Sequence, residues 1–189
     1  LFARWTFQSL QTLYIFTHLE EYTLQPNWLP GFLLRHQKSL LELGISFYPR
    51  YDNNLETASL GVSILNFFHH CPNLIKVGLN IQVFEWMQVA GTWKSRKWPR
   101  PPVVILLGLY PGTGLPSEDL ERLVPIKDKW GTKKIVVSMG WAELGVKRAS
   151  TSRWKALFSQ PQNDLLRISN SIGIPILDQY GTSLQEFLE

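Results

Sequence analysis

The sequence contains a single cysteine, Cys71, in 189 residues, which excludes an internal disulfide framework. It also lacks any Asn-x-Ser/Thr acceptor for N-linked glycans. Secreted domains often carry one or both of these features. Their absence favours a reducing compartment, so we expect an intracellular protein of the cytoplasm or the nucleus.

Long apolar stretches are missing as well. The longest uninterrupted aliphatic run, 103–107, ends at Gly108 and is far too short to cross a bilayer. The chain begins LFAR, without an initiator methionine and without the charged-then-apolar order of a signal peptide. We therefore expect no membrane association, and we interpret the sequence as a piece of a longer parent protein.

The charge balance is modest, with a formal net charge of +4, unlike the strongly basic balance of a typical nucleic-acid binder. Four basic residues nevertheless fall in one stretch, 93–100, where they alternate with tryptophans. Rings interleaved with cations are typical of nucleic-acid or phosphopeptide contacts. A solvated loop is the favoured interpretation, and a protein is a more favoured partner than a nucleic acid. The residues that would make such a contact are Trp93, Lys94, Arg96, Lys97, Trp98 and Arg100.

Short apolar runs alternate with amphipathic segments along the whole chain. The runs are rich in Val, Ile and Leu, as buried parallel strands are, and the segments between them have helical spacing. This alternation is typical of α/β proteins. The expected strands are 19–24, 40–47, 74–81, 103–110, 134–139 and 174–177, and the expected helices are 28–36, 57–68, 117–123 and 163–171.

Two α/β architectures fit this order: a solenoid with one strand and one helix per repeat, and a doubly wound sheet. A recurrent Leu-x-x-Leu-x-Leu spacing favours the solenoid. Its first residue turns the chain into a strand and the next two point into the core, while the residues between them point to the opposite face. The copies are Leu19/Tyr22/Leu24, Leu40/Leu43/Ile45, Leu74/Val77/Leu79, Val104/Leu107/Leu109, Lys134/Val137/Met139 and Ile174/Leu177/Gln179.

The segment HCPNL, 70–74, lies where an expected helix ends and the next strand begins. His69, His70 and Cys71 are consecutive, so their side chains diverge, whereas metal ligands converge from spacings such as C-x2-C. No base or oxyanion site can be identified that would activate Cys71 as a nucleophile. We interpret Cys71 as a small buried residue at a helix end, and we expect no metal, no cofactor and no catalytic residue.

The same junction, CPNL at 71–74 between NFFHH and IKVGL, resembles the helix-to-strand junction of leucine-rich repeats. In particular, it is similar to repeats of intracellular F-box proteins, many of them fungal. The resemblance implies a leucine-rich-repeat solenoid with parallel strands, outer helices and no catalytic centre. It further implies a protein-recognition module, namely the substrate-binding region of an F-box-type ubiquitin-ligase adaptor. We expect one domain over 1–189, with more regular repeats in 1–110 and irregular repeats or a C-terminal cap in 111–189.

In the solenoid interpretation, the side chains that flank the apolar positions line one concave sheet and bind the partner. Gly44 and Gly78 lie near the middle of this surface, where they would admit a partner's backbone. The pattern also places Leu106, Gly108 and Val136 there. The residues expected to bind are Glu21, Thr23, Gln25, Glu42, Ser46, Lys76, Asn80, Tyr110, Ser138, Asp178 and Tyr180.

A different class of function accompanies the doubly wound alternative, namely a small α/β enzyme or nucleotide-binding domain. The loop from Tyr110 to Gly114 follows an expected strand and leads into a helix, which is the layout of a phosphate-binding turn. The loop lacks both the Walker Lys-Ser/Thr pair and the full G-x-G-x-x-G, and its prolines remove backbone donors. The Gly-x-Ser-x-Gly motif of hydrolases is absent too. Recognition without catalysis is therefore the favoured function.

Overall fold

The computed structural model describes residues 7, 9–18, 28–48, 68, 70–80, 101–109, 111–112, 115, 120–146 and 159–189. The strands in these ranges are β1 (Thr12–His18), β2 (Glu42–Tyr48), β3 (Lys76–Asn80), β4 (Val103–Leu107), β5 (Ile135–Val137) and β6 (Ile176–Leu177). The helices are α1 (Trp28–His36), α5 (Ile126–Trp130), α6 (Ser159–Ile172) and α7 (Leu184–Leu188). None of these helices, the 14-residue α6 included, has the length and apolar character of a bilayer span.

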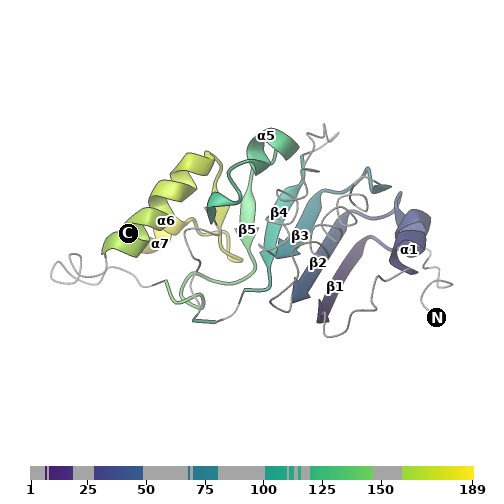
Figure 1. Ribbon diagram of the computed structural model, residues 1–189, viewed down its shortest axis with the longest axis horizontal. Coiled ribbons are helices and arrows are strands. Elements are labelled where there is room, and N and C mark those ends of the chain that lie inside the picture. The colour runs from purple at the N-terminus through teal and green to yellow at the C-terminus, as the bar shows by residue number, and fades with distance from the viewer. Residues whose placement is uncertain are drawn as a thin grey trace, which may run out of the picture.

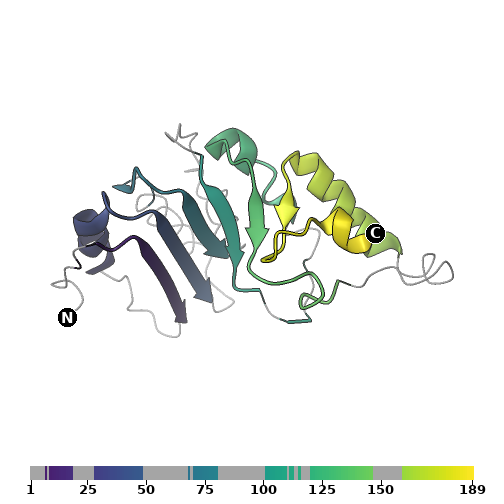
Figure 2. The same cartoon turned by 180° about the vertical axis from the view of Figure 1, so that it is seen from behind.

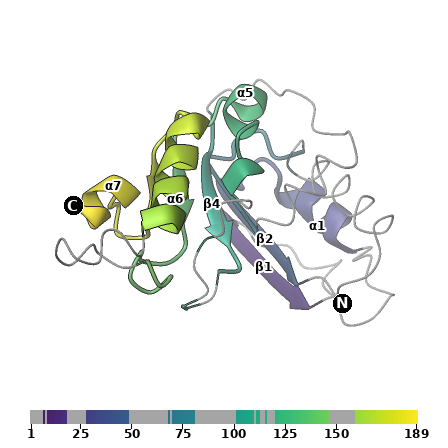
Figure 3. The same cartoon turned by 60° about the vertical axis from the view of Figure 1, so that its left-hand side comes forward.

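The six strands form one sheet in the order β1-β2-β3-β4-β5-β6, and every neighbouring pair is parallel. The strands follow one another along the long axis of the molecule, with β1 and α1 toward one end and β6 and α7 toward the other (Figures 1 and 3). The predicted α/β class with parallel strands is therefore confirmed. A doubly wound sheet reverses its strand order at a switch point. The six described strands show no such reversal, so that alternative does not fit.

The register of the sheet aligns apolar side chains into two rows that face the core. One row consists of Leu43, Val77, Val104 and Ile135, with Leu13 and Ile176 at its ends. The second row consists of Ile45, Leu79, Leu106 and Val137, with Ile15 at one end. Because side chains alternate along a strand, in-register parallel pairing puts all of these residues on one face.

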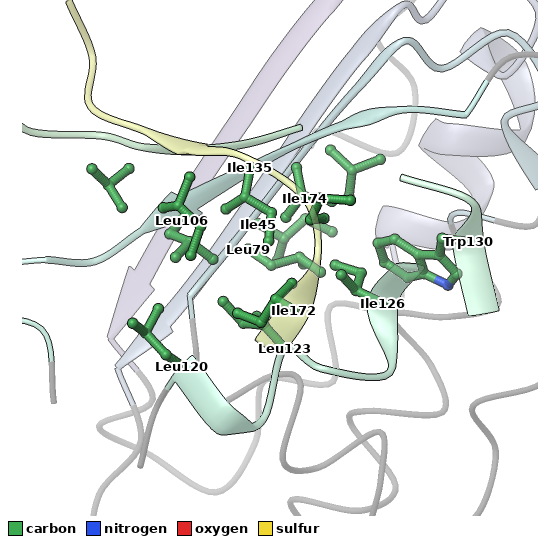
Figure 4. Close-up of a cluster of buried hydrophobic side chains, with 14 of the residues drawn as sticks. Ile45, Leu79, Leu106, Leu120, Leu123, Ile126, Trp130, Ile135, Ile172 and Ile174 are labelled. Carbon is green, nitrogen blue, oxygen red and sulfur yellow. The ribbon is translucent and has the colours of Figure 1, made fainter. Parts of the chain in front are cut away.

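Residues of the crossover segments cover this core face. Leu33 of α1, Phe68, and Ile168 and Ile172 of α6 all belong to the same buried cluster as the strand residues. Figure 4 shows Leu120, Leu123, Ile126 and Trp130 extending toward Ile45, Leu79, Leu106 and Ile135 of the strands. The chain thus returns repeatedly across one face of the sheet and buries the apolar rows there.

The junction before β3 has the structure expected for it. Phe68 and His70 are helical, and the Cys71 side chain that follows is fully buried in the core. The Asn73 side chain donates a hydrogen bond to the carbonyl oxygen of Lys38, 2.8 Å away in the turn before β2. The interpretation of Cys71 as a buried residue at a helix end is confirmed, and Asn73 ties one strand-entry turn to the next.

One strand was not predicted, and one strand prediction needs correction. The unpredicted strand is Thr12–His18, whereas the predicted strand 19–24 lies outside the described residues. In β4 the core-facing residues are Val104 and Leu106, not Val104, Leu107 and Leu109. The run VVILLGL is apolar at every position but one, so spacing alone does not determine which residues face inward.

The helix predictions agree better with the structure. The predicted helix 28–36 is confirmed as α1, and 163–171 lies within the longer α6, which is followed by Gly173 in a left-handed conformation. Of the predicted helix 117–123, Leu120 and Glu121 are helical, while 117–119 lie outside the described residues, as do 57–67. The sequence reasoning missed the short α5 and α7, the latter capped by Ser183 and Glu186.

We predict that Leu79→Ala will lower the free energy of unfolding by about 2–5 kcal/mol, because it leaves a cavity in a fully buried row. The matched control is Leu34→Ala on α1, where the leucine is 46% exposed. This control should change stability by no more than about 0.5 kcal/mol. Urea denaturation of both variants would check this, and equal losses would contradict the assignment of the core face.

Candidate binding surface on the open face of the sheet

The face of the sheet opposite the core is called here the open face. It follows from the register, since it consists of the strand residues that alternate with the buried rows. Figure 2 shows the sheet from behind the view of Figure 1. The residues of the open face are Thr12, Tyr14, Phe16, Glu42, Gly44, Ser46, Lys76, Gly78, Asn80, Val103, Ile105, Leu107, Val136 and Leu177.

An ion pair lies at the amino ends of β2 and β3. Lys76 Nζ is 2.6 Å from Glu42 Oε1, and the two side chains are 44% and 22% exposed. The residues are directly opposite each other in the register, so the pair bridges neighbouring strands. Glu42 and Lys76 were both predicted on this surface, and the structure brings them together.

Tyr14 of β1 lies across the two glycines of the open face. A Cβ atom placed on Gly44 would overlap the Tyr14 ring, and one on Gly78 would lie 2.8 Å from Leu107 Cδ1 and 3.2 Å from Tyr14 Cε1. Only residues without a side chain can sit beneath this ring. The expectation that these glycines admit a partner's backbone is therefore wrong for this conformation, because Tyr14 and Leu107 occupy the space above them.

Tyr14, Glu42 and Lys76 are electrostatically coupled to one another. Burial raises the pKa of Tyr14 above its ordinary value of 10.0, and the charge of Glu42 and a hydrogen bond to it raise the pKa further. The Lys76 cation acts in the opposite direction on the pKa of Tyr14. Glu42 in turn raises the pKa of Lys76, chiefly through their hydrogen bond. Both pKa values are raised, so the site holds a neutral phenol and an ammonium group at neutral pH.

The carboxyl ends of β2 and β3 are less accessible than predicted. Ser46 and Asn80 are on the open face but are buried. A Cβ on Gly108, whose φ is 71°, would lie 3.2 Å from both Ser46 Oγ and Asn80 Cβ. Ser46 Oγ has no hydrogen-bond partner among the described residues. In this conformation neither Ser46 nor Asn80 presents its side chain to a partner.

The accessible part of the open face beyond β3 is aliphatic. Ile105 pairs with Val136, and Val136 pairs with Leu177, so these three half-buried side chains form a band across β4, β5 and β6. Of these, the sequence pattern predicted only Val136. Ile105 was missed because the spacing in β4 was assigned with the wrong register. Phe16, 60% exposed on the open face of β1, was missed because the strand itself was not predicted.

The predicted residues near β5 and β6 have separate roles. Ser138 is half-buried just after β5. Asp178 is only 4% exposed, and its Oδ1 accepts hydrogen bonds from the backbone N–H groups of Tyr180 and Thr182. The carboxylate thus holds a turn, and the role of Asp178 in binding stays a prediction. Tyr180 is 72% exposed, as a contact residue should be.

Glu143 holds two loops together at this end. Its Oε2 accepts hydrogen bonds from Gly140 N (3.0 Å) and Gln179 Nε2 (3.1 Å), and its Oε1 accepts one from the Tyr180 hydroxyl (3.2 Å). Nearby, Trp141 Nε1 donates to the carbonyl oxygen of Thr182 at 2.8 Å. The loop after β5 and the turn after β6 are thus joined by side-chain hydrogen bonds.

Of the glycine loop 110–114, the structure describes only Pro111 and Gly112. The N–H of Gly112 donates to the carbonyl oxygen of Glu143 at 2.8 Å, whereas a phosphate-binding turn needs free N–H groups. Among the described residues, no three His, Cys, Asp or Glu side chains are placed to hold a metal ion. Several predicted residues lie outside the described ranges: Glu21, Thr23, Gln25, Trp93, Lys94, Arg96, Lys97, Trp98, Arg100, Tyr110 and Gly114.

We predict that the pKa of Tyr14 will fall in Glu42→Gln and rise in Lys76→Gln, because the two charges shift it in opposite directions. Alkaline absorbance titration would measure it, with Tyr14→Phe subtracted to remove the other tyrosines. Because folding raises the pKa of Tyr14, its neutral phenol stabilises the folded state in full below pH 10. This stabilisation is lost as the pH rises through the pKa of Tyr14 in the folded protein. A pKa of Tyr14 that shifts in the same direction in both variants would contradict the placement of Tyr14 beside Glu42 and Lys76.

We predict that Gly44→Ala will destabilise the protein by about 1–3 kcal/mol, because the new methyl group displaces the Tyr14 ring. In a Tyr14→Ala background the same change should cost much less or be neutral. Unfolding free energies of the four proteins would give the coupling energy. Additive effects would show that the ring does not occupy the space above Gly44.

Comparison with known proteins gives no family assignment. No protein-family model matches the chain, and no curated protein or solved structure matches it. The function therefore has to be inferred from the side chains of the open face and from their contacts.

Proposed function

We propose that this chain is a solenoid of the leucine-rich-repeat type that recognises another protein through the open face. The observation that carries the proposal is the sheet itself: six parallel strands in chain order, one face buried and the other partly accessible. Solenoids stack similar units so that each contacts its neighbours, and they bind through the surface that the strands line.

Spacing along the chain supports the repeat interpretation. Core residues at one register position are separated by 27 residues between Val77 and Val104 and by 41 between Ile135 and Ile176. These separations fall near the 20–45 residues typical of solenoid units. The bond from Asn73 to Lys38 links corresponding turns of two successive units, as stacked repeats require.

The accessible side chains support recognition of a protein surface. The aliphatic band of Ile105, Val136 and Leu177 offers apolar area, and the Glu42–Lys76 pair provides charged groups near its border. An apolar centre with a polar rim is the usual anatomy of a protein interface. Tyr14 and Phe16 add aromatic rings, which are enriched among residues that dominate binding energy.

The resemblance to F-box proteins suggests the biological setting for this recognition. In that setting the open face is the substrate-binding region of a ubiquitin-ligase adaptor, and the partner is a protein presented for modification. Neither a catalytic residue nor a cofactor is needed for this role, because selection of the substrate rests on complementary surfaces.

We predict that Val136→Lys will weaken partner binding at least about tenfold, because it places a charge in the aliphatic band. The matched control is Val124→Lys, at a 41% exposed valine outside the sheet. The immobilised wild type and both variants would be compared for proteins that they retain from a cell extract, with thermal melting to confirm folding. Partners retained equally by Val136→Lys and by the wild type would contradict the proposal.

A further inference from the structure

The two edges of the sheet differ in how they are protected. At the β6 edge, Leu177 forms an antiparallel bridge with Ser183, and the Asp178 N–H donates to the carbonyl oxygen of Thr182. The chain therefore folds back along β6 and occupies its outer edge. At the β1 edge, no described strand pairs with the outer side, although β1 is seven residues long.

The backbone groups that face outward from β1 can be assigned from its pairing with β2. The carbonyl oxygen of Gln11 accepts hydrogen bonds from the N–H groups of Leu41 and Glu42. Because these groups alternate along a strand, Leu13, Ile15 and Thr17 also direct theirs toward β2. The N–H and C=O groups of the alternate residues, Tyr14 and Phe16 among them, consequently point away from the sheet.

Natural edge strands are protected by lysine, proline, bulges or short length. The sequence TLYIFTH of β1 contains no lysine, no proline, no acidic residue and no glycine. Its side chains are also incompletely covered: Leu13 and Ile15 are half-buried, whereas their register partners Leu43 and Ile45 are fully buried. Both the backbone and the side chains of β1 thus have the character of an interior strand.

We propose that β1 pairs with β1 of a second copy of this chain, antiparallel and across a two-fold axis at Ile15, the middle residue of the strand. This register places the partner's Phe16 opposite Tyr14, so that outward-facing backbone groups meet as hydrogen-bonded pairs. Ile15 faces the partner's Ile15 on the core side. Thr12 and His18 lie opposite each other at the two ends.

The residues of β1 favour a second copy of this chain as the partner of its outer edge. A two-fold axis normal to the sheet keeps both core faces on one side, so each Ile15 covers the exposed flank of the other, and each Leu13 lies opposite residue 17 of the second copy. On the open face, Tyr14 and Phe16 already stack within one strand, with ring centroids 6.5 Å apart and planes at 13°, and dimerisation adds their aromatic cross-strand pairs. Since β1 carries no Lys, Arg, Asp or Glu, its self-pairing opposes no like charges.

The pairing has a consequence for the open faces. The same two-fold axis would place both of them on one side of a single continuous sheet. A dimer would then present two copies of the aliphatic band in one plane, which goes beyond recognition by an isolated chain.

The test compares Phe16→Pro with Phe16→Val by light scattering and sedimentation over a range of concentrations. Proline removes the outward N–H of residue 16, which the pairing with β2 does not use, whereas valine keeps it. The wild type and Phe16→Val should approach twice the 21.8 kDa chain mass. In Phe16→Pro the dimer dissociation constant should rise at least tenfold, with circular dichroism unchanged.

A wild type that stays monomeric up to its solubility limit would overturn the proposal, and so would a dimer unaffected by Phe16→Pro. If that variant fails to fold, amide hydrogen exchange of the wild type decides the question. The Tyr14 and Phe16 amides should be protected at high concentration and should lose that protection on dilution. Protection that does not depend on concentration would rule out pairing between copies.

Discussion

In-register parallel pairing is the constraint on which the structure depends. Side chains alternate with a period of two, so a slip of one residue in any strand would move its aliphatic residues from the core face to the open face. The rows through Leu43 and Ile45 run unbroken to β5 because each strand keeps this register. The position of every open-face residue, including the Glu42–Lys76 pair, follows from the burial of the opposite face.

The same constraint explains why part of the open face is filled by the protein itself. Gly44 and Gly78 are neighbours in the register, so they create a strip without side chains across β2 and β3. Tyr14 fills this strip from β1 and Leu107 from β4, and the tyrosine ring lies beside the ion pair. The accessible surface therefore divides into an aromatic and charged part over β1 to β3 and an aliphatic part over β4 to β6.

The sequence predicted the α/β class, the parallel strands and the positions of β2, β3 and α1, because their apolar runs are bounded by turns and polar residues. The prediction of core-facing residues failed in β4, where apolar residues occupy both faces of the strand. Val104 and Leu106 face the core there, and Leu107 lies over Gly78 on the open face. The part that Asp178 plays in its turn was not predicted, because residue type alone does not show that a carboxylate holds a turn. The aliphatic band depends on the pairing of three different strands, which spacing within one strand cannot reveal.

The chain order of the strands also bears on how the protein is made. Each described strand after β1 pairs with the described strand that precedes it, so these ladders join segments a few tens of residues apart. The entropic cost of closing a loop rises only slowly with its length, so connections of this size add little to the cost of each pairing. As the nascent chain leaves the ribosome, β2 can join β1 before β3 exists, and each new strand can add to an edge that is already in place. Assembly can thus proceed from β1 to β6 at the pace of translation, and the segment that follows β6 then covers the outer edge of that strand.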